Sequence, residues 1–311
     1  MKWRVLVSAP YMQPVLDQYE HRFEEQDIET VVPDVLERLS EAELLDIISD
    51  IDGVIAGDDR FTLAVFEKAK RLKVISKWGT GVDSFDHEAA RRHGVTICST
   101  SDAFSDPVAD SVLGYCLLFA RKLHLMDRQM RQDCWEKIPA VSLSECRIGV
   151  IGVGNVGKAV IRRAFAFGMK ILGNDSAEIL PEFIREFKVE MTSKENLLGQ
   201  ADFVSLNCDL NPTSHHIIAG EEMMLMKQTA YLINTARGGL VKESVLQTAL
   251  ETHQIAGAAL DVFEHEPLPS SSPLRKFENC LLAPHNANSS PRAWQKVHEN
   301  TFRNLIMGLK G

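Results

Sequence analysis

Three side chains that could together reduce a carbonyl group follow three separate apolar segments late in the chain. Arg237 comes shortly after YLIN, Glu266 after GAAL, and His285 after CLLA. An arginine can bind a carboxylate through two parallel N–H bonds. A protonated imidazole can give a proton to the oxygen that becomes an alcohol. A carboxylate beside the other ring nitrogen favours the protonated ring and fixes its orientation. The three residue types therefore fit carbonyl reduction in a substrate that carries a carboxylate.

Each of these residues also has an ordinary explanation when it is taken alone. Arg237 could form a surface ion pair, Glu266 could be a solvated turn residue, and His285 could be a loop histidine. All three, however, follow successive predicted strands, and parallel α/β sheets bind their ligands beyond the carboxyl ends of their strands. This shared position favours one common site over three coincidences.

A glycine-rich turn in the middle of the chain has the spacing of a dinucleotide-binding site. The run GVGNVG, residues 152–157, follows a short apolar segment and opens a helix-like one, and Asp175 lies 18 positions beyond Gly157. In this setting Gly152 permits a tight turn, Gly154 lets backbone approach a pyrophosphate, and Gly157 lets helix and strand pack closely. Asp175 would accept hydrogen bonds from ribose hydroxyls and repel a 2′-phosphate, which predicts NAD rather than NADP. The alternative is a plain βαβ turn with a surface aspartate.

Composition limits the class of protein and its partners. The 311 residues, 45% hydrophobic and 25% charged, are typical of a globular protein with one large or two medium domains. A net charge of −9 argues against nucleic acid and anionic membranes as partners. Six widely spaced cysteines without metal-ligand spacing favour reduced thiols in the cytoplasm. No apolar run approaches the roughly 18 residues that a membrane span needs.

The first hundred residues read as an α/β unit. Helical patterns at 15–23 and 41–49 alternate with short apolar runs, which predicts a mostly parallel sheet covered on both faces. The predicted strands are 3–7, 28–32, 53–56, 73–76 and 95–98.

The rest of the chain predicts a second doubly wound sheet. A single long helix is expected from Ser105 through SVLGYCLLFARKLHLMDRQM, and it suits either intramolecular packing or a dimer surface. About six strands follow, and residues 294–309 read as an amphipathic helix. The predicted strands are 148–151, 169–172, 202–207, 230–234, 255–260 and 279–283.

The chain resembles the D-isomer-specific 2-hydroxyacid dehydrogenases, which include D-lactate, glyoxylate/hydroxypyruvate and phosphoglycerate dehydrogenases. The resemblance covers nearly the whole chain and is most specific in its last three motifs. The segments that carry it are SKWGTGVDSFD (76–86), PVADSVLGYCLLFAR (107–121), GVGNVG, NTARGGLV (234–241), ALDVFEHEP (259–267) and APH (283–285). It implies hydride transfer between NAD(H) and a small D-2-hydroxy or 2-oxo acid, and it leaves open whether that acid is phosphorylated.

The resemblance also implies a role for each motif. Arg237 would bind the substrate carboxylate, His285 would be the acid/base, and Glu266 would be its partner. The carboxylate would also meet the segment formed by Lys77, Trp78, Gly79, Thr80 and Gly81. The residues that would contact NAD are Gly152, Gly154, Asn155, Val156, Gly157, Asp175, Cys208, Thr235, Ala236 and Asp261.

The implied architecture is two doubly wound parallel-sheet domains. A Rossmann NAD-binding domain would span 101–287, and a smaller flavodoxin-like substrate domain would combine 1–100 with 288–311. The long helix would then form a homodimer interface. The alternative function is a non-enzymatic NAD-sensing module, similar to a corepressor, on the same fold.

Lys77, Trp135 and the adjacent histidines at 215 and 216 are further candidates for a role in the site. Lys77 could meet a substrate anion or be a solvated strand-end lysine, and Trp135 could reach a neighbouring subunit or pack on the surface. His215 and His216 are adjacent, so their side chains are expected to diverge, and no metal site is predicted.

Overall fold

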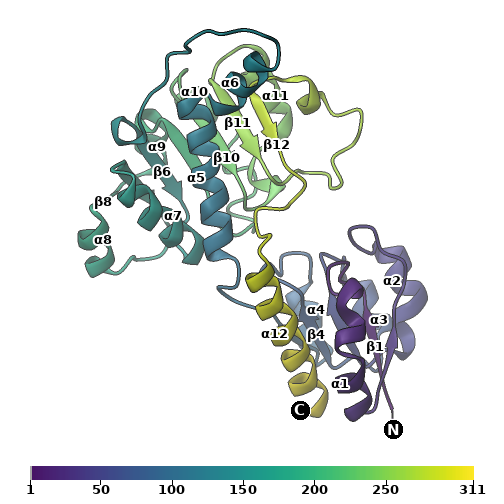
Figure 1. Cartoon of the computed structure of the whole chain (residues 1–311). Helices are drawn as coiled ribbons and strands as arrows, with labels where there is room; N and C mark the ends of the chain where they lie inside the picture. The colour runs from purple at the N-terminus through teal and green to yellow at the C-terminus, as the bar shows by residue number, and fades with distance from the viewer. Residues whose placement is uncertain (1) are drawn as a thin grey trace. The chain divides into compact units, whose positions relative to one another are not determined.

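The computed structural model describes residues 2–311, which divide into two compact units (Figure 1). The first unit is Met1–Phe104 with Ser290–Gly311, and the second is Ser105–Ser289. The divisions predicted from the sequence were after residue 100 and after residue 287. Each unit has its own parallel sheet.

The first unit is built on a five-stranded sheet in the order β2-β1-β3-β4-β5, with every neighbouring pair parallel. This is the flavodoxin-like order, in which the chain reverses direction across the sheet beside its first strand. The predicted strands are confirmed to within a residue. They are β1 (Trp3–Val7), β2 (Ile28–Val31), β3 (Gly53–Ala56), β4 (Val74–Lys77) and β5 (Thr96–Cys98).

Helices cover this sheet, and the C-terminal helix is one of them. The predicted amphipathic tail forms α12 (Pro291–Lys310), which packs on β3, β4 and β5. The contact is close because Gly308 carries no side chain: a Cβ there would lie 2.4 Å from a methyl group of Val74. The other helices of the unit are α1 (Glu20–Glu25), α2 (Glu41–Ile47), α3 (Leu63–Lys68) and α4 (His87–Arg92), with 3-10 turns at Gln13–Gln18 and Ile48–Asp50.

The second unit holds a seven-stranded parallel sheet in the order β12-β11-β10-β9-β6-β7-β8. The strand order reverses beside β6, as in a dinucleotide-binding Rossmann sheet. The strands are β6 (Arg147–Ile151), β7 (Lys170–Asn174), β8 (Val189–Met191), β9 (Phe203–Leu206), β10 (Tyr231–Asn234), β11 (Gly257–Leu260) and β12 (Cys280–Leu282).

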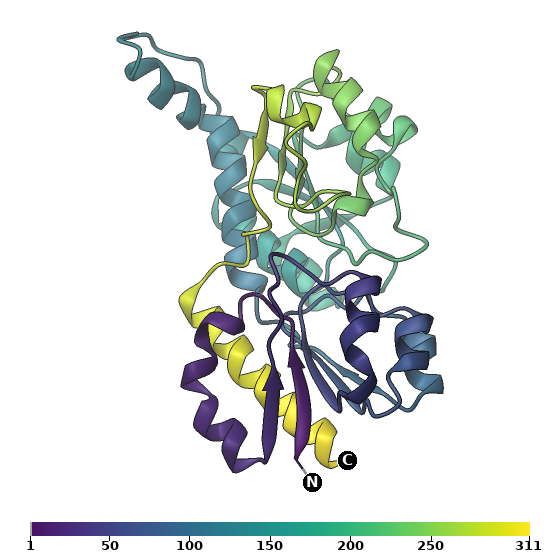
Figure 2. The same cartoon turned by 90° about the vertical axis from the view of Figure 1, so that its right-hand side faces the viewer.

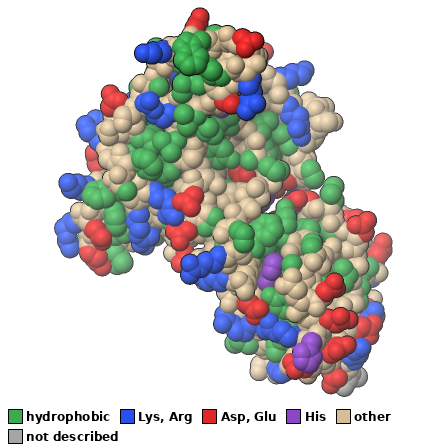
Figure 3. Space-filling view, in the orientation of Figure 1, with side chains coloured by type: hydrophobic (Ala, Val, Ile, Leu, Met, Phe, Trp, Pro, Cys, Tyr) green, Lys and Arg blue, Asp and Glu red, His purple; other side chains and the backbone are tan. Residues whose placement is uncertain are grey.

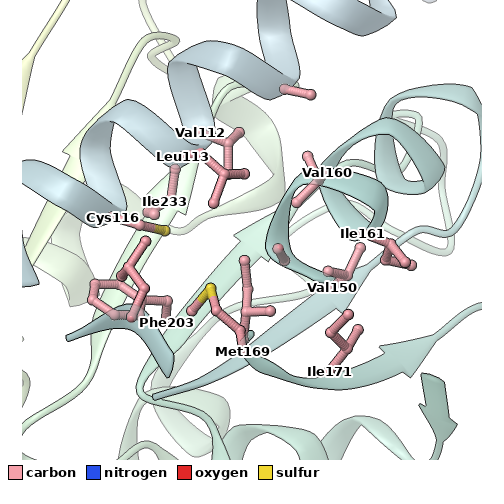
Figure 4. Close-up of a cluster of buried hydrophobic side chains, with 14 of the residues drawn as sticks. Val112, Leu113, Cys116, Val150, Val160, Ile161, Met169, Ile171, Phe203 and Ile233 are labelled. Carbon is pink, nitrogen blue, oxygen red and sulfur yellow. The ribbon is translucent and has the colours of Figure 1, made fainter. Parts of the chain in front are cut away.

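Each face of the large sheet has its own hydrophobic core. On one face, Val112 and Cys116 of α5 meet Val160 of α7 above Val150 and Phe203 of the sheet (Figure 4). On the other face, a second cluster joins the sheet to α9, α10 and α11. The helices of this unit are α5 (Ser105–Arg121), α6 (Leu123–Met130), α7 (Asn155–Ala166), α8 (Pro181–Phe187), α9 (Lys194–Gln200), α10 (Gly220–Leu225) and α11 (Glu243–Glu251), with 3-10 turns at Leu143–Glu145, Gly238–Leu240 and Pro273–Lys276.

The structure corrects two expectations for the second unit. The long helix from Ser105 is not continuous, because Lys122 takes a left-handed backbone conformation (φ 55°) and separates α5 from α6. The sheet has one strand more than expected, because the short edge strand β8 was missed. Among residues 2–311, no helix combines the length and the apolar character that a bilayer span requires. Positive and negative side chains are interspersed on the visible face of both units (Figure 3).

Candidate active site

The turn that carries Arg237 is held by a buried asparagine at the end of β10. The side-chain oxygen of Asn234 accepts the N–H of Ala236 at 3.1 Å, and its amide nitrogen donates to the carbonyl of Arg237 at 2.9 Å. Asn234 is 1% exposed, so these bonds are shielded from water. The next residue, Gly238, lies against the backbone of Phe263, where a Cβ would come within 2.0 Å of its carbonyl oxygen. The Arg237 turn is therefore fixed to the loop that follows β11.

That loop carries Glu266, which contacts His285. Nδ1 of His285 lies 3.0 Å from Oε2 of Glu266, and the other carboxylate oxygen accepts the N–H of Phe263 at 2.9 Å. The His285 and Glu266 side chains are 22% and 17% exposed. Since β10, β11 and β12 are neighbours in the sheet, Arg237, Glu266 and His285 follow three adjacent strands.

Asp261 holds the segment around His285. One carboxylate oxygen accepts the N–H of Asn286 and the other accepts the N–H of Ala287, both at 2.8 Å. Its backbone carbonyl accepts the N–H of His285. His285 itself has a left-handed backbone (φ 51°), a conformation uncommon in residues other than glycine, asparagine, aspartate and histidine. Burial raises the pKa of the Asp261 carboxyl, against the effect of the two N–H donors.

Glu264, on the same loop, forms a second histidine–carboxylate pair, which sequence reasoning missed. Nε2 of His216 lies 2.7 Å from Oε1 of Glu264, and the N–H of His216 donates to Gly239 beside the arginine turn. The N–H of Glu264 donates to Glu243, whose pKa is raised by burial. The sequence signal for this second pair was the EHE run of residues 264–266, because its two carboxylates can pair with different histidines.

The glycine turn has the geometry that its motif predicts. Gly152 has φ 88°, and a Cβ there would lie 2.5 Å from the backbone of Cys208. A Cβ at Gly157 would lie 2.0 Å from the carbonyl oxygen of Gly152, whereas a Cβ at Gly154 would meet nothing within 4 Å. The turn is thus closely packed on its protein side and open at Gly154. The 12-residue helix α7 begins here and directs unpaired N–H groups outward.

The remaining residues predicted to contact a cofactor lie around this turn or at strand ends. The Asp175 carboxylate accepts the N–H of Val153 at 2.6 Å and that of Ala177 at 2.7 Å. Thr235 is 9% exposed and its hydroxyl has no hydrogen-bond partner. Buried polar groups are normally hydrogen-bonded, so this hydroxyl is a candidate to bond a ligand. Asn155 is exposed and Val156 half-buried, and burial raises the pKa of the Cys208 thiol to about 11. The open turn and the unpartnered hydroxyl fit a dinucleotide.

The segment after β4 presents backbone donors. The N–H of Trp78 donates to Ala56 at 2.8 Å, which joins the segment to the end of β3. Within the described residues, the N–H groups of Gly79, Thr80 and Gly81 donate no hydrogen bond. Gly79 has φ 126°, a value that favours glycine. Three successive unpaired donors can bind an anion.

The structure excludes one of the two interpretations of Lys77 and contradicts the expectation for His215 and His216. Lys77 is not a solvated lysine, because it is 4% exposed and its ammonium lies 2.9 Å from Asp58. The rings of His215 and His216 do not diverge, since their centroids lie 3.8 Å apart. Within the described chain, neither histidine belongs to a group of three side chains placed to share a metal. The exposed Trp135 (86%) lies in the loop after α6.

Fold and site together define the class of protein. A seven-stranded Rossmann sheet with a glycine turn at its switch point binds a dinucleotide. An imidazole paired with a carboxylate at neighbouring strand ends adds acid/base chemistry. The second unit is therefore that of a nicotinamide-dependent oxidoreductase.

Comparison with known proteins identifies the family. The model of the D-isomer specific 2-hydroxyacid dehydrogenase NAD-binding domain matches residues 113–287. A glyoxylate reductase of Korarchaeum cryptofilum is 34% identical over 100% of this chain and 94% of its own length. A D-3-phosphoglycerate dehydrogenase of Methanocaldococcus jannaschii is 39% identical over 82% of this chain and 49% of its own. The crystal structure of the TT0316 protein from Thermus thermophilus is 33% identical, with a TM-score of 0.84 and coverage of 99% and 97%. The chain belongs to the D-isomer specific 2-hydroxyacid dehydrogenases, and it is an NAD-dependent enzyme of that family.

Proposed function

We propose that this chain uses NADH to reduce glyoxylate, hydroxypyruvate or a similarly small 2-oxo acid to the D-2-hydroxy acid. The observation that carries the proposal is the 3.0 Å contact between His285, which follows β12, and Glu266, which follows β11 next to the strand that leads to Arg237. The similarity to a glyoxylate reductase over the whole chain supports the same substrate class.

The proposed mechanism divides the work among three side chains. Arg237 binds the substrate carboxylate and polarises the adjacent carbonyl. The bound cofactor would supply the chemistry of hydride transfer, as donor in its reduced form (NADH) and as acceptor in its oxidised form (NAD⁺). His285 gives its proton to the carbonyl oxygen, and Glu266 keeps the ring oriented and favours its protonated form. In the reverse direction His285 takes the proton from the hydroxyl.

For the cofactor we propose the residues around the glycine turn and the strand ends. Backbone at Gly154, Asn155 and Val156 would meet the pyrophosphate, and Asp175 would accept hydrogen bonds from the ribose in place of those it now accepts from backbone. The other proposed contacts are Gly152, Gly157, Cys208, Thr235, Ala236 and Asp261. Because a 2′-phosphate would face the Asp175 carboxylate, NADH should bind more tightly than NADPH in a fluorescence titration, and the reverse order would contradict the assignment.

For the first unit we propose that the segment after β4 contributes to substrate binding. The unpaired N–H groups of Gly79, Thr80 and Gly81 support a role in binding the substrate carboxylate. Lys77 and Trp78 begin the same segment, and both are buried. The second unit would then be the NAD-binding domain.

We further propose a homodimer in the cytoplasm. Helix α6 has no buried residue although it carries four apolar side chains, and Leu123, Met130, Trp135 and Val141 of this region are 46%, 50%, 86% and 47% exposed. In Figure 2, α6 and its loop extend beyond the rest of the second unit. All six cysteines are free, which is consistent with a reducing compartment.

The central test replaces His285. Because its φ is positive, His285→Asn preserves a backbone conformation that asparagine tolerates, whereas His285→Ala adds strain. Both variants should lower kcat with glyoxylate and hydroxypyruvate by about 10²–10⁴-fold and leave NADH binding intact. Replacement of the exposed His93 by alanine is the matched control. Undiminished turnover in both His285 variants would refute the role, and no turnover of any 2-oxo acid by the wild type would favour the NAD-sensing alternative.

A further inference from the structure

The ring of Trp78 packs among three other aromatic rings of the first unit. Its centroid lies 5.2 Å from that of Tyr11, 5.8 Å from that of Phe104 and 5.7 Å from that of Trp294. The rings of Tyr11 and Trp294 also contact each other, with centroids 5.3 Å apart. All these distances are typical of favourable aromatic pairs. Trp78 is 5% exposed, so these four side chains form an aromatic cluster with Trp78 in its interior.

Packing alone holds the two indole rings of the aromatic cluster. The Nε1 atoms of Trp78 and Trp294 are both buried, and neither has a hydrogen-bond partner. Because an indole has no other polar atom, no hydrogen bond of the side chain fixes the orientation of either ring. Removal of the Trp294 ring would therefore open space beside Trp78 and leave only the remaining neighbours to orient it.

The backbone donors after Trp78 depend on how this ring is packed. Gly79 and Gly81 have no side chain and Thr80 is exposed, so Trp78 supplies the buried side chain of the segment. Two hydrogen bonds join the segment to Thr100, whose N–H donates to the Gly79 carbonyl at 2.8 Å and whose carbonyl accepts the Thr80 hydroxyl at 3.1 Å. Glycine gives the backbone wide conformational freedom. The direction of the three N–H groups is therefore set largely by their neighbours.

Two of those neighbours lie next to the points where the chain passes between the units. Phe104 is the last residue of the first unit before α5. Trp294 lies in the first turn of α12, soon after the second unit ends at Ser289. Both residues contact the ring of Trp78. The stretches of chain that leave and re-enter the first unit thus hold the residue that precedes the backbone donors.

We propose that Trp294 is a positioning residue for the substrate, because its packing on Trp78 orients the N–H groups of residues 79–81 toward the carboxylate. The inference rests on the proposed function, in which this segment contributes to binding that carboxylate. Every 2-oxo acid carries the carboxylate, whereas the rest of the molecule differs from one acid to the next. Loss of the Trp294 ring should therefore weaken the binding of different 2-oxo acids by the same factor.

The test measures KM and kcat separately for glyoxylate and hydroxypyruvate. Trp294→Ala should raise both KM values about tenfold or more, because hydrogen bonds to a charged group are lost. The kcat values should change less than about threefold, since the three proposed catalytic side chains are intact. The ratio of kcat/KM for the two acids should stay within about twofold of the wild-type ratio. NADH affinity, measured by fluorescence titration, should not change, because the glycine turn belongs to the second unit.

A conservative variant and a matched control accompany this substitution. Trp294→Phe keeps an aromatic ring and breaks no hydrogen bond, so both KM values should stay within about twofold of the wild type. Trp3→Ala is the control, since Trp3 is a partly buried tryptophan of the same unit. It begins β1, whereas the donor segment follows the carboxyl end of the parallel strand β4. Trp3→Ala should change neither KM nor kcat.

Trp294→Leu keeps the test decisive if the alanine variant does not fold, because leucine leaves a smaller cavity. This variant should raise both KM values about threefold or more. Unchanged KM values in the alanine and leucine variants would overturn the positioning role, and so would a lower kcat at unchanged KM, which a partly unfolded enzyme shows. A rise in KM for one acid alone would also overturn it. In these cases the proposed function stands, whereas reduction of neither acid by the wild type would overturn both.

Discussion

Asn234 and Asp261 show how the candidate site is organised at the level of single residues. The sequence predicted a positioning role for neither residue. Both polar atoms of each side chain nevertheless form hydrogen bonds with backbone groups at or next to Arg237 or His285. Motif reading found the residues at the strand ends because their types and spacing are local. It could not find the Lys77–Asp58 pair, since these residues are 19 positions apart and meet only when β3 and β4 pair.

Glu266 and Glu264 allow a matched test of the acid/base assignment. Each carboxylate pairs with a histidine, but Glu266 contacts His285 and Glu264 contacts His216. Glu266→Gln keeps an oxygen for the N–H of Phe263 but removes the charge that supports a protonated ring. We expect kcat to fall about 100-fold. Glu264→Gln should lower kcat less than about fivefold in the same steady-state assay. Equal losses in the two variants would mean that both pairs serve only to hold the loop.

At the scale of elements, the strands were predicted better than the helices. Strands β1, β3 and β4 of the small sheet are mainly apolar runs bounded by turn residues, and their sequence signal is strong. Strand β8 has three residues at an edge with the exposed Glu190 at its centre, so it gives almost no apolar signal. No glycine or proline next to Lys122 indicates that the helix breaks there. Lys122 has a left-handed backbone conformation, and its ammonium lies 3.0 Å from the hydroxyl of Tyr231. Because Tyr231 is 109 positions further along the chain, the local sequence does not reveal this contact.

Gly154, which caps α7, and Gly157, in its first turn, should respond differently to the same substitution. A Cβ at Gly157 would come within 2.0 Å of a carbonyl oxygen, so Gly157→Ala should destabilise the second unit by about 2–4 kcal/mol. A Cβ at Gly154 would meet nothing within 4 Å, so Gly154→Ala should leave stability almost unchanged and weaken NADH binding about tenfold. Thermal unfolding and NADH titration separate the two effects. If Gly154→Ala retains full affinity, the pyrophosphate does not approach this residue.

Helix α12 should make the first unit sensitive to acid through His298. This histidine is 8% exposed beside Trp78 and Tyr19, and its Nε2 has no hydrogen-bond partner. Burial lowers the pKa of His298 below 6.5, against the Tyr11 carbonyl and the Glu299 carboxylate, so the unfolded chain binds a proton more readily. The stability that this histidine confers is complete above about pH 6.5 and is lost as pH falls through its lowered pKa.

Urea unfolding followed by tryptophan fluorescence measures this loss, since Trp78 and Trp294 adjoin the ring or its neighbours. Below about pH 6.5 the free energy of unfolding should fall by at most about 1.4 kcal/mol per pH unit from this group. His298→Phe should remove that part of the slope. Replacement of the exposed His21 by phenylalanine should not. An unchanged slope in His298→Phe would assign the acid sensitivity to other groups.

At the scale of the whole molecule, α6 carries apolar side chains that no other part of the described chain buries. Its apolar side chains remain at least partly exposed, and Leu123 and Met130 are about half exposed. Its eight residues span only about 12 Å, too short for the roughly 800 Å² per partner of a stable interface. The loop after it, with Trp135 and Val141, must therefore contribute if this region joins two copies.

Charge substitutions in α6 test this interface. The wild type should sediment at twice the mass of one chain, and Leu123→Asp combined with Met130→Asp should give monomers, because two carboxylates would be buried unpaired at the contact. Leu36→Asp is the matched control, since Leu36 is 86% exposed in the first unit and lies outside this region. Unchanged thermal unfolding of the double variant would show that dissociation does not follow from misfolding. A wild type that sediments as a single chain at micromolar concentration would contradict the proposed homodimer, and the exposed apolar residues of α6 would then need a different partner.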